Sequence, residues 1–149
     1  MLFYEDMTPG DSMKSPTVTV DGDEMVEFAK RWDPLSIHVD ETQARASGGL
    51  TAPGLFMLAL KQRLIHQLPE HAVIASLGYD EVRFHAPVRP DDTLHVHYEW
   101  VDRRESTSKA DRGIVTVRLS LINQAGITVM SHLDTILVRR RVPRMTGNA

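Results

Sequence analysis

Apolar and polar residues alternate along the second half of the chain with the period of a β-strand. Side chains of a strand point to its two faces in turn, so this alternation indicates strands with one dry face. It is clearest at every second residue from 94 to 100: Leu94, Val96, Tyr98 and Trp100. The pattern predicts four strands, over 73–85, 93–102, 114–122 and 127–138. Asn123 to Gly126 predicts the hairpin turn between the last two strands.

The first half of the chain has the period of a helix. Asp21, with Glu24 three residues later, predicts a helix start, and the apolar residues that follow share one face: Met25, Val26, Phe28, Ala29 and Trp32. Asp40 with Gln43 predicts a second, short helix that ends at Ser47-Gly48-Gly49. Residues 1–15 are expected to be a lead-in with a turn at Pro9-Gly10, and residues 17–20 a short strand.

The segment 54–68 predicts the central helix of the fold. Residues 55–60 are apolar on every side, and a helix of that kind is buried and must be wrapped by another element. Its later polar residues are expected to face solvent: Lys61, Gln62, Arg63 and His66. An antiparallel sheet curled round this helix satisfies both patterns and predicts an α+β fold. Long edge strands in such a sheet favour pairing between two copies.

Length and composition limit the classes of function. The chain of 149 residues predicts a single domain, 1–149, with a frayed Arg139–Arg141 segment and a disordered tail over 142–149. A net charge of −3 argues against nucleic acid as the main partner. The absence of cysteine excludes disulfides, thiolate metal sites and cysteine nucleophiles. We recognise neither a secretory signal nor a run of membrane-spanning length, and expect a cytoplasmic protein without a membrane partner.

The stretch WDPLSIHVD places Asp33 and His38 five residues apart, just before the apolar helix. Each residue alone is more often structural, Asp33 as a turn residue before Pro34 and His38 as a half-buried core histidine. Together they can hold one water between them, with one group taking a proton and the other giving one. Catalysis is therefore the favoured interpretation of the pair, whereas Asp40 is interpreted as a helix cap.

Several weaker patterns are interpreted as structural. His95 and His97, with His85 as a third candidate, resemble a metal site, but a solvated strand face is favoured and no metal is expected. Gly48-Gly49 is interpreted as loop flexibility, since no nucleotide fingerprint surrounds it. A basic cluster is interpreted as a solvated hairpin tip, or alternatively as a contact for CoA phosphates on a neighbouring subunit: Arg103, Arg104, Lys109 and Arg112. No serine lies in a nucleophile-elbow motif.

Four segments, in the element order of the hotdog fold, resemble the MaoC-like (R)-specific enoyl-CoA hydratase family: RWDPLSIHVD, GGLTAPG, DEVRFHAPVRPDDTL and DRGIVTVRLSLINQAG. The resemblance covers nearly the whole chain, from about residue 3 to residue 141. It implies an antiparallel sheet wrapped round a long central helix. It also implies interconversion of trans-2-enoyl-CoA and (R)-3-hydroxyacyl-CoA, with the CoA thioester as substrate and no further cofactor.

The resemblance also implies roles for individual residues. Asp33 and His38 match the family's catalytic pair, and Gly54 matches the glycine whose N–H holds the thioester oxygen. That role suits a helix start, where free N–H groups and the helix dipole converge. Pro53, Leu55 and Phe56 are the accompanying candidates for substrate binding.

The sequence departs from the family's pattern in two places and leaves alternatives open. Leu35 and Ser36 stand where the family often has Asn-Pro, and Pro53 stands where His or Ser is common. A hotdog acyl-CoA thioesterase and a non-catalytic acyl-CoA-binding subunit therefore remain as alternatives to a hydratase. The expected partner is a second copy of the chain, in a homodimer or a dimer of dimers.

Overall fold

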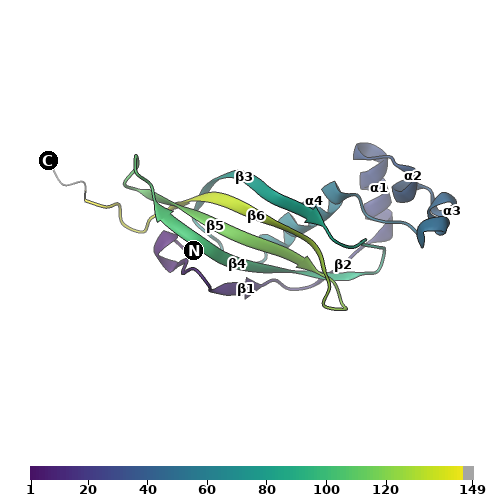
Figure 1. The fold of residues 1–149 in the computed structure, drawn as a ribbon, viewed down its shortest axis with the longest axis horizontal. Coiled ribbons are helices and arrows are strands. Elements are labelled where there is room, and N and C mark those ends of the chain that lie inside the picture. The colour runs from purple at the N-terminus through teal and green to yellow at the C-terminus, as the bar shows by residue number, and fades with distance from the viewer. Residues whose placement is uncertain (146–149) are drawn as a thin grey trace.

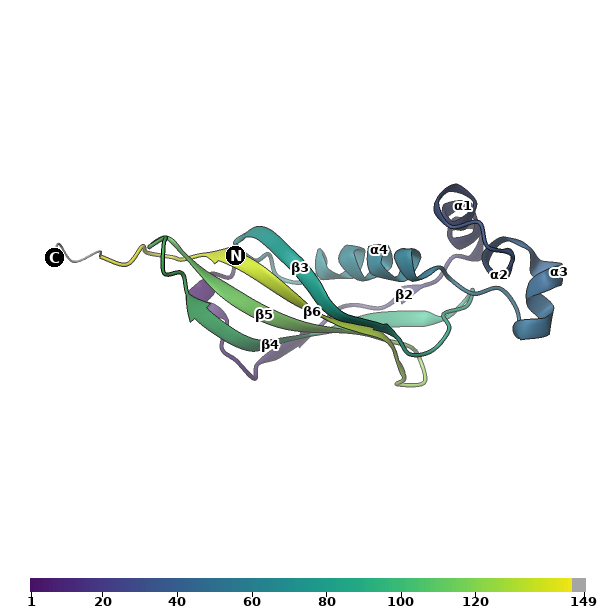
Figure 2. The ribbon, with the colours of Figure 1, turned by 45° about the horizontal axis from the view of Figure 1, so that its top comes forward.

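The architecture is that of a computed structural model, which describes residues 1–145. In chain order the elements are η1 (Tyr4–Asp6), β1 (Ser12–Lys14), β2 (Val18–Thr19), α1 (Gly22–Trp32), α2 (Ser36–Val39), α3 (Glu41–Ala44), η2 (Arg45–Ser47), α4 (Gly54–Ile65), β3 (Val73–Phe84), β4 (Thr93–Glu105), β5 (Arg112–Ile122) and β6 (Thr128–Arg139). The strands form an antiparallel sheet in the order β1-β4-β5-β6-β3, and β2 pairs with β4. Figures 1 and 2 show α4 running along one face of the sheet, with α1, α2 and α3 gathered beyond one end of it.

The core lies between α4 and the concave face of the sheet, as the alternation predicted. The inward residues of β4 and β5 are buried: Leu94, Val96, Tyr98, Trp100, Val115, Val117, Leu119 and Leu121. Helix α4 contributes Phe56, Met57, Leu60 and Leu64 from its other side. The α+β architecture and the four long strands are therefore confirmed, and the two predicted caps are confirmed as well, since Asp21 and Asp40 accept backbone hydrogen bonds at the starts of α1 and α3.

The expectation that residues 55–60 are buried on every side is wrong for the single chain. Leu55 is 54% exposed and Ala59 is exposed, while Phe56 and Leu60 are covered by the sheet. One curled sheet covers only one side of a helix, so the opposite stripe of α4 stays open. Trp32, expected on the buried face of α1, is 60% exposed, because α1 ends beyond the sheet at that residue.

Lys61 was expected in solvent, and that expectation is also wrong. Its side chain is fully buried between α4 and the sheet, where Nζ donates hydrogen bonds to the Tyr79 hydroxyl (3.1 Å) and to Gln62 Oε1 (3.3 Å). Residues three and four apart on a helix share a face. Lys61 therefore follows Met57 and precedes Leu64 on the face that packs on the sheet.

Replacing Lys61 with methionine should stabilise the protein at neutral pH. Burial lowers the pKa of Lys61 from 10.5 to about 8, against a smaller opposing effect of Asp134. The unfolded chain therefore binds more protons than the folded one between pH 8 and 10.5, and the penalty for burying the charge is present below pH 8 and relieved above it. We expect Lys61→Met to raise the free energy of unfolding at pH 7 by about 1–2 kcal/mol, as measured by urea unfolding.

The gain from Lys61→Met should shrink at pH 10, where the wild-type ammonium has lost its proton. Arg63→Met is the matched control, because Arg63 is exposed on the same helix, and it should change stability by less than about 0.5 kcal/mol. A clear loss of stability in Lys61→Met at pH 7 would contradict the argument.

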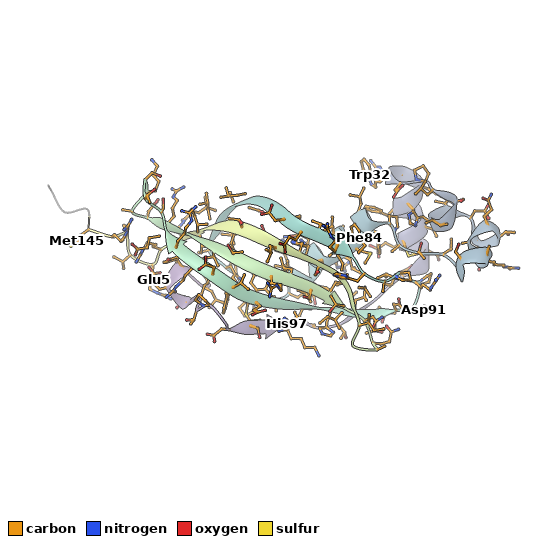
Figure 3. All side chains as sticks on the ribbon, in the orientation of Figure 1. Glu5, Trp32, Phe84, Asp91, His97 and Met145 are labelled. Atoms are coloured by element: carbon orange, nitrogen blue, oxygen red, sulfur yellow. The ribbon has the colours of Figure 1, made fainter. Side chains whose placement is uncertain are left out.

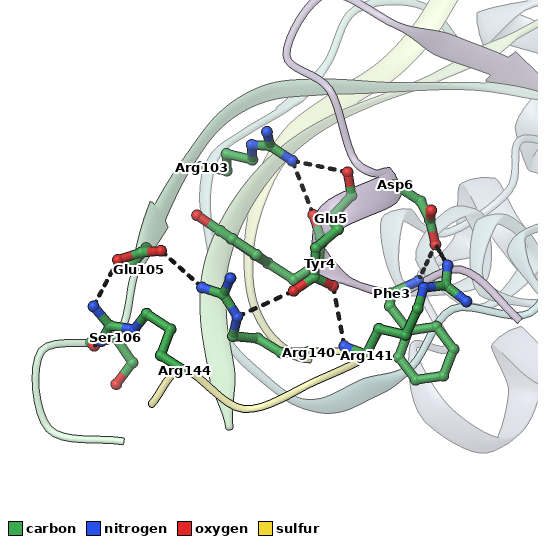
Figure 4. A network of polar contacts seen from close by, with 10 residues as sticks. All are labelled: Phe3, Tyr4, Glu5, Asp6, Arg103, Glu105, Ser106, Arg140, Arg141 and Arg144. Atoms are coloured by element: carbon green, nitrogen blue, oxygen red, sulfur yellow. Dashed lines mark hydrogen bonds and ion pairs between the residues drawn. The ribbon is translucent and has the colours of Figure 1, made fainter. Parts of the chain in front are cut away.

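The two ends of the described chain meet at the end of the sheet opposite α1, α2 and α3 (Figure 1), and Figure 4 shows the polar contacts between them. Arg140 pairs with Glu5 (3.0 Å) and Glu105 (2.8 Å), and Arg141 pairs with Asp6 (2.6 Å). Arg144 pairs with Glu105 as well (2.6 Å). The expectation that Arg139–Arg141 is frayed is therefore wrong. Arg139 is the last residue of β6 and donates its backbone N–H to Ala72 O, and carboxylates hold the side chains of Arg140 and Arg141. The last part of the tail, 146–149, lies outside the described residues.

Tyr4 is the centre of this contact between the ends, and Gly113 makes room for it. The ring of Tyr4 lies between two guanidinium groups. Its centre is 5.3 Å from Cζ of Arg103 and 5.2 Å from Cζ of Arg140. A Cβ on Gly113 would overlap Cε2 of the Tyr4 ring, so the ring would have to leave its place. We expect Gly113→Ala to lower the free energy of unfolding by about 2–3 kcal/mol, measured by urea unfolding.

The same change in a Tyr4→Ala background tests the cause of that loss. With the ring removed, Gly113→Ala should have little further effect, because the clash has gone. An equal loss in both backgrounds would assign the effect to the backbone of β5 instead.

Candidate active site

The candidate site lies in the helical region at one end of the sheet, on the short segment between α1 and α4. Helix α1 ends where the N–H of Asp33 donates to Ala29 O (2.8 Å), and the N–H of His38 then donates to Leu35 O (2.9 Å). Residues 36–39, expected as part of a loop, form the one-turn helix α2. This turn directs the imidazole of His38 inward, where the residue is 7% exposed. In Figure 3, Trp32 and Phe84 mark this end, and Glu5 and Met145 mark the opposite end.

The structure brings Asp33 and His38 together, as the sequence predicted. His38 Nε2 lies 3.7 Å from Asp33 Oδ2, and the side chains are 9% and 33% exposed. His38 Nδ1 lies 2.6 Å from the carbonyl oxygen of Thr51. A carbonyl can only accept a hydrogen bond, so Nδ1 carries the proton and Nε2 of the neutral ring presents its lone pair towards Asp33. Two acceptors at this distance can share one hydrogen-bond donor such as a water molecule.

Thr51 is a positioning residue that the sequence analysis did not identify. Its carbonyl orients His38, and its own N–H donates to Ile37 O (3.1 Å), so the segment after Gly49 is held to α2. The next residue, Ala52, donates to Val88 O (2.8 Å), which ties the same segment to the connection between β3 and β4. The motif GGLTAPG contained Thr51, but a backbone carbonyl leaves no signal in the residue type.

Arg89 is a second positioning residue that the sequence analysis missed. Its guanidinium donates to the carbonyls of Gly49 (2.7 Å) and Ser47 (3.0 Å). The backbone N–H of Arg89 donates to the carboxylate of Asp92 (2.9 Å). Gly48 has a φ of 88° and Gly49 a φ of 112°, in the left-handed region that glycine adopts without strain. The Gly-Gly pair, interpreted as loop flexibility, therefore makes a defined turn held by Arg89.

Gly54 begins α4 three residues after Thr51, so its N–H is among the free donors of the first helical turn. A Cβ on Gly54 would lie 2.5 Å from Phe84 Cζ, which means that the Phe84 ring packs directly over the glycine. Together with Met57 and Thr51, these two residues line a cavity, whose other walls are Ala52, His85, Ala86 and Pro87.

The three remaining candidates for substrate binding lie around Gly54 but outside the lining of this cavity. Pro53 is buried at the N-cap of α4, Phe56 is 4% exposed in the core, and Leu55 is 54% exposed on the open side of the helix. Their roles stay predictions.

The described residues 1–145 contain no group of three His, Asp or Glu side chains arranged to hold a metal ion. His97 lies on β4 opposite Lys14 of β1, and both His95 and His97 are partly exposed. Burial, helped by the charges of Lys14 and His97, lowers the pKa of His95. Over the same residues, each helix is too short or too polar to span a membrane.

The sequence model of one protein family, described as "MaoC like domain", matches residues 5–123 of this chain. Among known proteins, the chain is 30% identical to the uncharacterized protein YdeM of Bacillus subtilis over 91% of this chain and 98% of that one. It is 29% identical to the mesaconyl-CoA hydratase of Cereibacter sphaeroides, over 93% of this chain but 41% of that protein.

Solved structures show the same fold. The crystal structure of a MaoC-like dehydratase from Rhodospirillum rubrum shares 35% identity with a TM-score of 0.89, covering 95% of this chain and 99% of that one. A Mycobacterium tuberculosis protein with a double hotdog fold, 22% identical, gives a TM-score of 0.75 over 97% of this chain and 46% of that one. The architecture is therefore a hotdog fold, and this chain corresponds to about half of the double one.

Proposed function

We propose, from the premise that this chain belongs to the MaoC-like domain family, that it hydrates trans-2-enoyl-CoA to (R)-3-hydroxyacyl-CoA or catalyses the reverse dehydration. Membership of the family and the similarity to a MaoC-like dehydratase support hydratase or dehydratase chemistry in general. The observation that carries the specific proposal is the pairing of Asp33 with His38, whose Nε2 is free to accept a proton.

In the proposed reaction the pair handles the attacking water. His38 Nε2 takes a proton from the water as its oxygen bonds to C3 of the enoyl group. The carboxylate of Asp33, 3.7 Å away, stabilises the imidazolium that forms. The same proton then passes to C2, so no net proton is consumed and both additions occur on one face of the double bond. Thr51 O keeps the ring in the required tautomer throughout.

The negative charge that develops on the thioester oxygen needs a donor, and we assign that role to the N–H of Gly54. Free N–H groups at a helix start point along the axis toward an incoming anion. Close approach of the thioester is possible because Gly54 has no Cβ. The chemistry needs no other group than the CoA thioester substrate and water, and we place it in the cytoplasm.

The proposed partner is a second copy of the chain, paired through β3. Within residues 1–145 this strand is at the edge of the sheet and bonds only to β6. It exposes large apolar side chains: Val73, Leu77, Tyr79 and Phe84. The double hotdog relative supports the pairing of two such units. We expect light scattering to give twice the chain mass of 16.8 kDa, and Leu77→Lys to shift the protein towards monomer. A wild-type monomer would contradict the proposal.

The decisive experiment incubates the pure protein with crotonyl-CoA and follows the loss of the enoyl-thioester absorbance. Formation of (R)-3-hydroxybutyryl-CoA, identified by chiral analysis, is the expected result. Release of free CoA thiol instead would make the protein a thioesterase. Binding of the thioester with no turnover of short, long or branched enoyl-CoAs would make it a non-catalytic subunit.

A further inference from the structure

Two cavities lie along α4, one beside each end of the helix. The first is the cavity at Gly54, which Met57 also lines. The second, of about 390 Å³, lies between the C-terminal end of α4 and the first half of β3, and its walls include Gln62, Ile65, Tyr79, Tyr98 and Asp134. The second cavity has no part in the reaction proposed above.

Lys61 lies between the two cavities. Residues four apart occupy one face of a helix, so Met57, Lys61 and Ile65 form a row. The first lines one cavity and the last lines the other. Lys61 is fully buried between them, with Nζ 3.1 Å from the Tyr79 hydroxyl and 4.4 Å from the centre of its ring. The Tyr79 ring in turn packs on the ring of His132, with 4.3 Å between the ring centres.

These three side chains, Lys61, Tyr79 and His132, are named the polar bar here. They are held by one another and by neighbouring polar groups rather than by an ion pair. Among residues 1–145, Lys61 has no carboxylate within ion-pair distance, and Asp134, the nearby acid, accepts a hydrogen bond from Ser76 (2.6 Å). His132 is 2% exposed, and its Nε2 has no hydrogen-bond partner in the described part of the chain.

The polar bar is a poor surface for a hydrocarbon chain. An alkyl tail that reached it would have to displace a hydrogen-bonded ammonium or lie against it without replacing its hydrogen bonds, and both are unfavourable in a buried site. A tail that stopped before the bar would lie against Met57 and the other walls of the cavity at Gly54. The Cα atoms of Gly54 and Lys61 are separated by roughly 10.5 Å along the helix, and the lysine side chain leans back towards Gly54.

We propose that the polar bar closes the acyl-binding side of the site and restricts the enzyme to short enoyl thioesters. This inference rests on the proposed hydratase function and deepens it, because it names the substrate class. A four-carbon acyl group fits between Gly54 and the bar, whereas an eight-carbon group needs the space on the far side. Lys61 is thus a specificity-determining residue, because a flexible apolar side chain in its place would let an alkyl tail pack past it along α4 towards the second cavity.

The test compares kcat/KM for crotonyl-CoA and trans-2-octenoyl-CoA in the wild type and in Lys61→Met. The wild type should prefer crotonyl-CoA at least tenfold. Lys61→Met, which replaces the ammonium with an apolar group of similar length, should raise kcat/KM for octenoyl-CoA at least tenfold and change that for crotonyl-CoA less than about threefold. Four more methylene groups are buried in the variant, and each contributes to binding.

Two further variants separate the bar from general effects on the fold. Tyr79→Phe keeps the ring but removes the hydroxyl that holds Lys61, and it should shift the preference in the same direction by a smaller factor. Arg63→Met makes the same kind of change on the exposed side of α4 and should leave the ratio as in the wild type.

The results separate a failure of the chain-length inference from a failure of the proposed hydratase function. A wild type that hydrates octenoyl-CoA as well as crotonyl-CoA, or an unchanged ratio in both bar variants, would overturn the inference and leave the hydratase standing. A wild type that hydrates neither thioester would overturn the proposed function, and this inference with it.

Discussion

Replacing His38 with glutamine should lower kcat for enoyl-CoA hydration by about 10²- to 10⁴-fold. Glutamine keeps a polar planar group in the same space, but it cannot take a proton from water. The atom that would accept this proton is Nε2 of His38. Nδ1 is hydrogen-bonded to Thr51 O at 2.6 Å, whereas Nε2 lies 3.7 Å from Oδ2 of Asp33. Steady-state hydration of crotonyl-CoA measures the loss.

Asp33→Asn should cause a loss of similar size by removing the charge that stabilises the imidazolium. The double variant should be little worse than either single one, because two groups that act as a unit show strongly non-additive effects. His97→Gln is the matched control for His38→Gln, since it makes the same change on the outer face of β4. Asp40→Asn is the control for Asp33→Asn, because Asp40 caps α3 and lies in the same region.

Retention of more than about a third of the wild-type kcat in folded His38→Gln and Asp33→Asn would remove the pair from the reaction. Thermal unfolding of each variant shows whether it is folded, and the controls should match the wild type in both rate and melting temperature. If His38 acts as the general base, a variant without its imidazole cannot have a near-normal kcat.

Gly54→Ala should lower kcat by about 10²-fold, the effect of losing one preorganised donor to a developing oxyanion. A Cβ at this position would lie 2.5 Å from Phe84 Cζ, so the ring must move into the cavity that it lines with Met57. Either the ring or the methyl group then displaces the thioester oxygen from the N–H. The effect should fall on kcat more than on KM, because the donor acts most strongly when charge has developed.

Gly22→Ala is the matched control for Gly54→Ala, since Gly22 is also the first residue of a helix and its added Cβ would meet Pro90 at 3.1 Å. It should leave kcat unchanged. Combining Gly54→Ala with Phe84→Ala separates the two causes: recovery to the rate of Phe84→Ala alone assigns the loss to the displaced ring. A Gly54→Ala enzyme with the full wild-type kcat would contradict the assignment of this N–H as the oxyanion donor.

Several features followed from the sequence because they depend on local order along the chain. Strand alternation, the caps at Asp21 and Asp40 and the apolar run after Gly54 are short-range patterns, and each matches an element of the structure. Asp33 and His38 are also close in sequence, so a single turn of chain is enough to bring their side chains to 3.7 Å. The three-residue strand β1 was missed, because Ser12 to Lys14 is too short and polar to show a period and forms only by pairing with β4.

The tertiary structure decided what depends on partners far away in the chain. Lys61 looks like a surface residue from its neighbours, and only the sheet folded over α4 makes it buried, with its partner Tyr79 18 residues away. Arg140 and Arg141 have basic neighbours in the sequence, and only the return of the first turn to the end of β6 supplies the carboxylates of Glu5 and Asp6. The sequence thus determined the elements and the pair of reactive groups, since backbone propensity and side-chain period are local. Burial and hydrogen-bond partners come from packing between distant segments, and they determined the tautomer of His38 and the position of Lys61 between the two cavities.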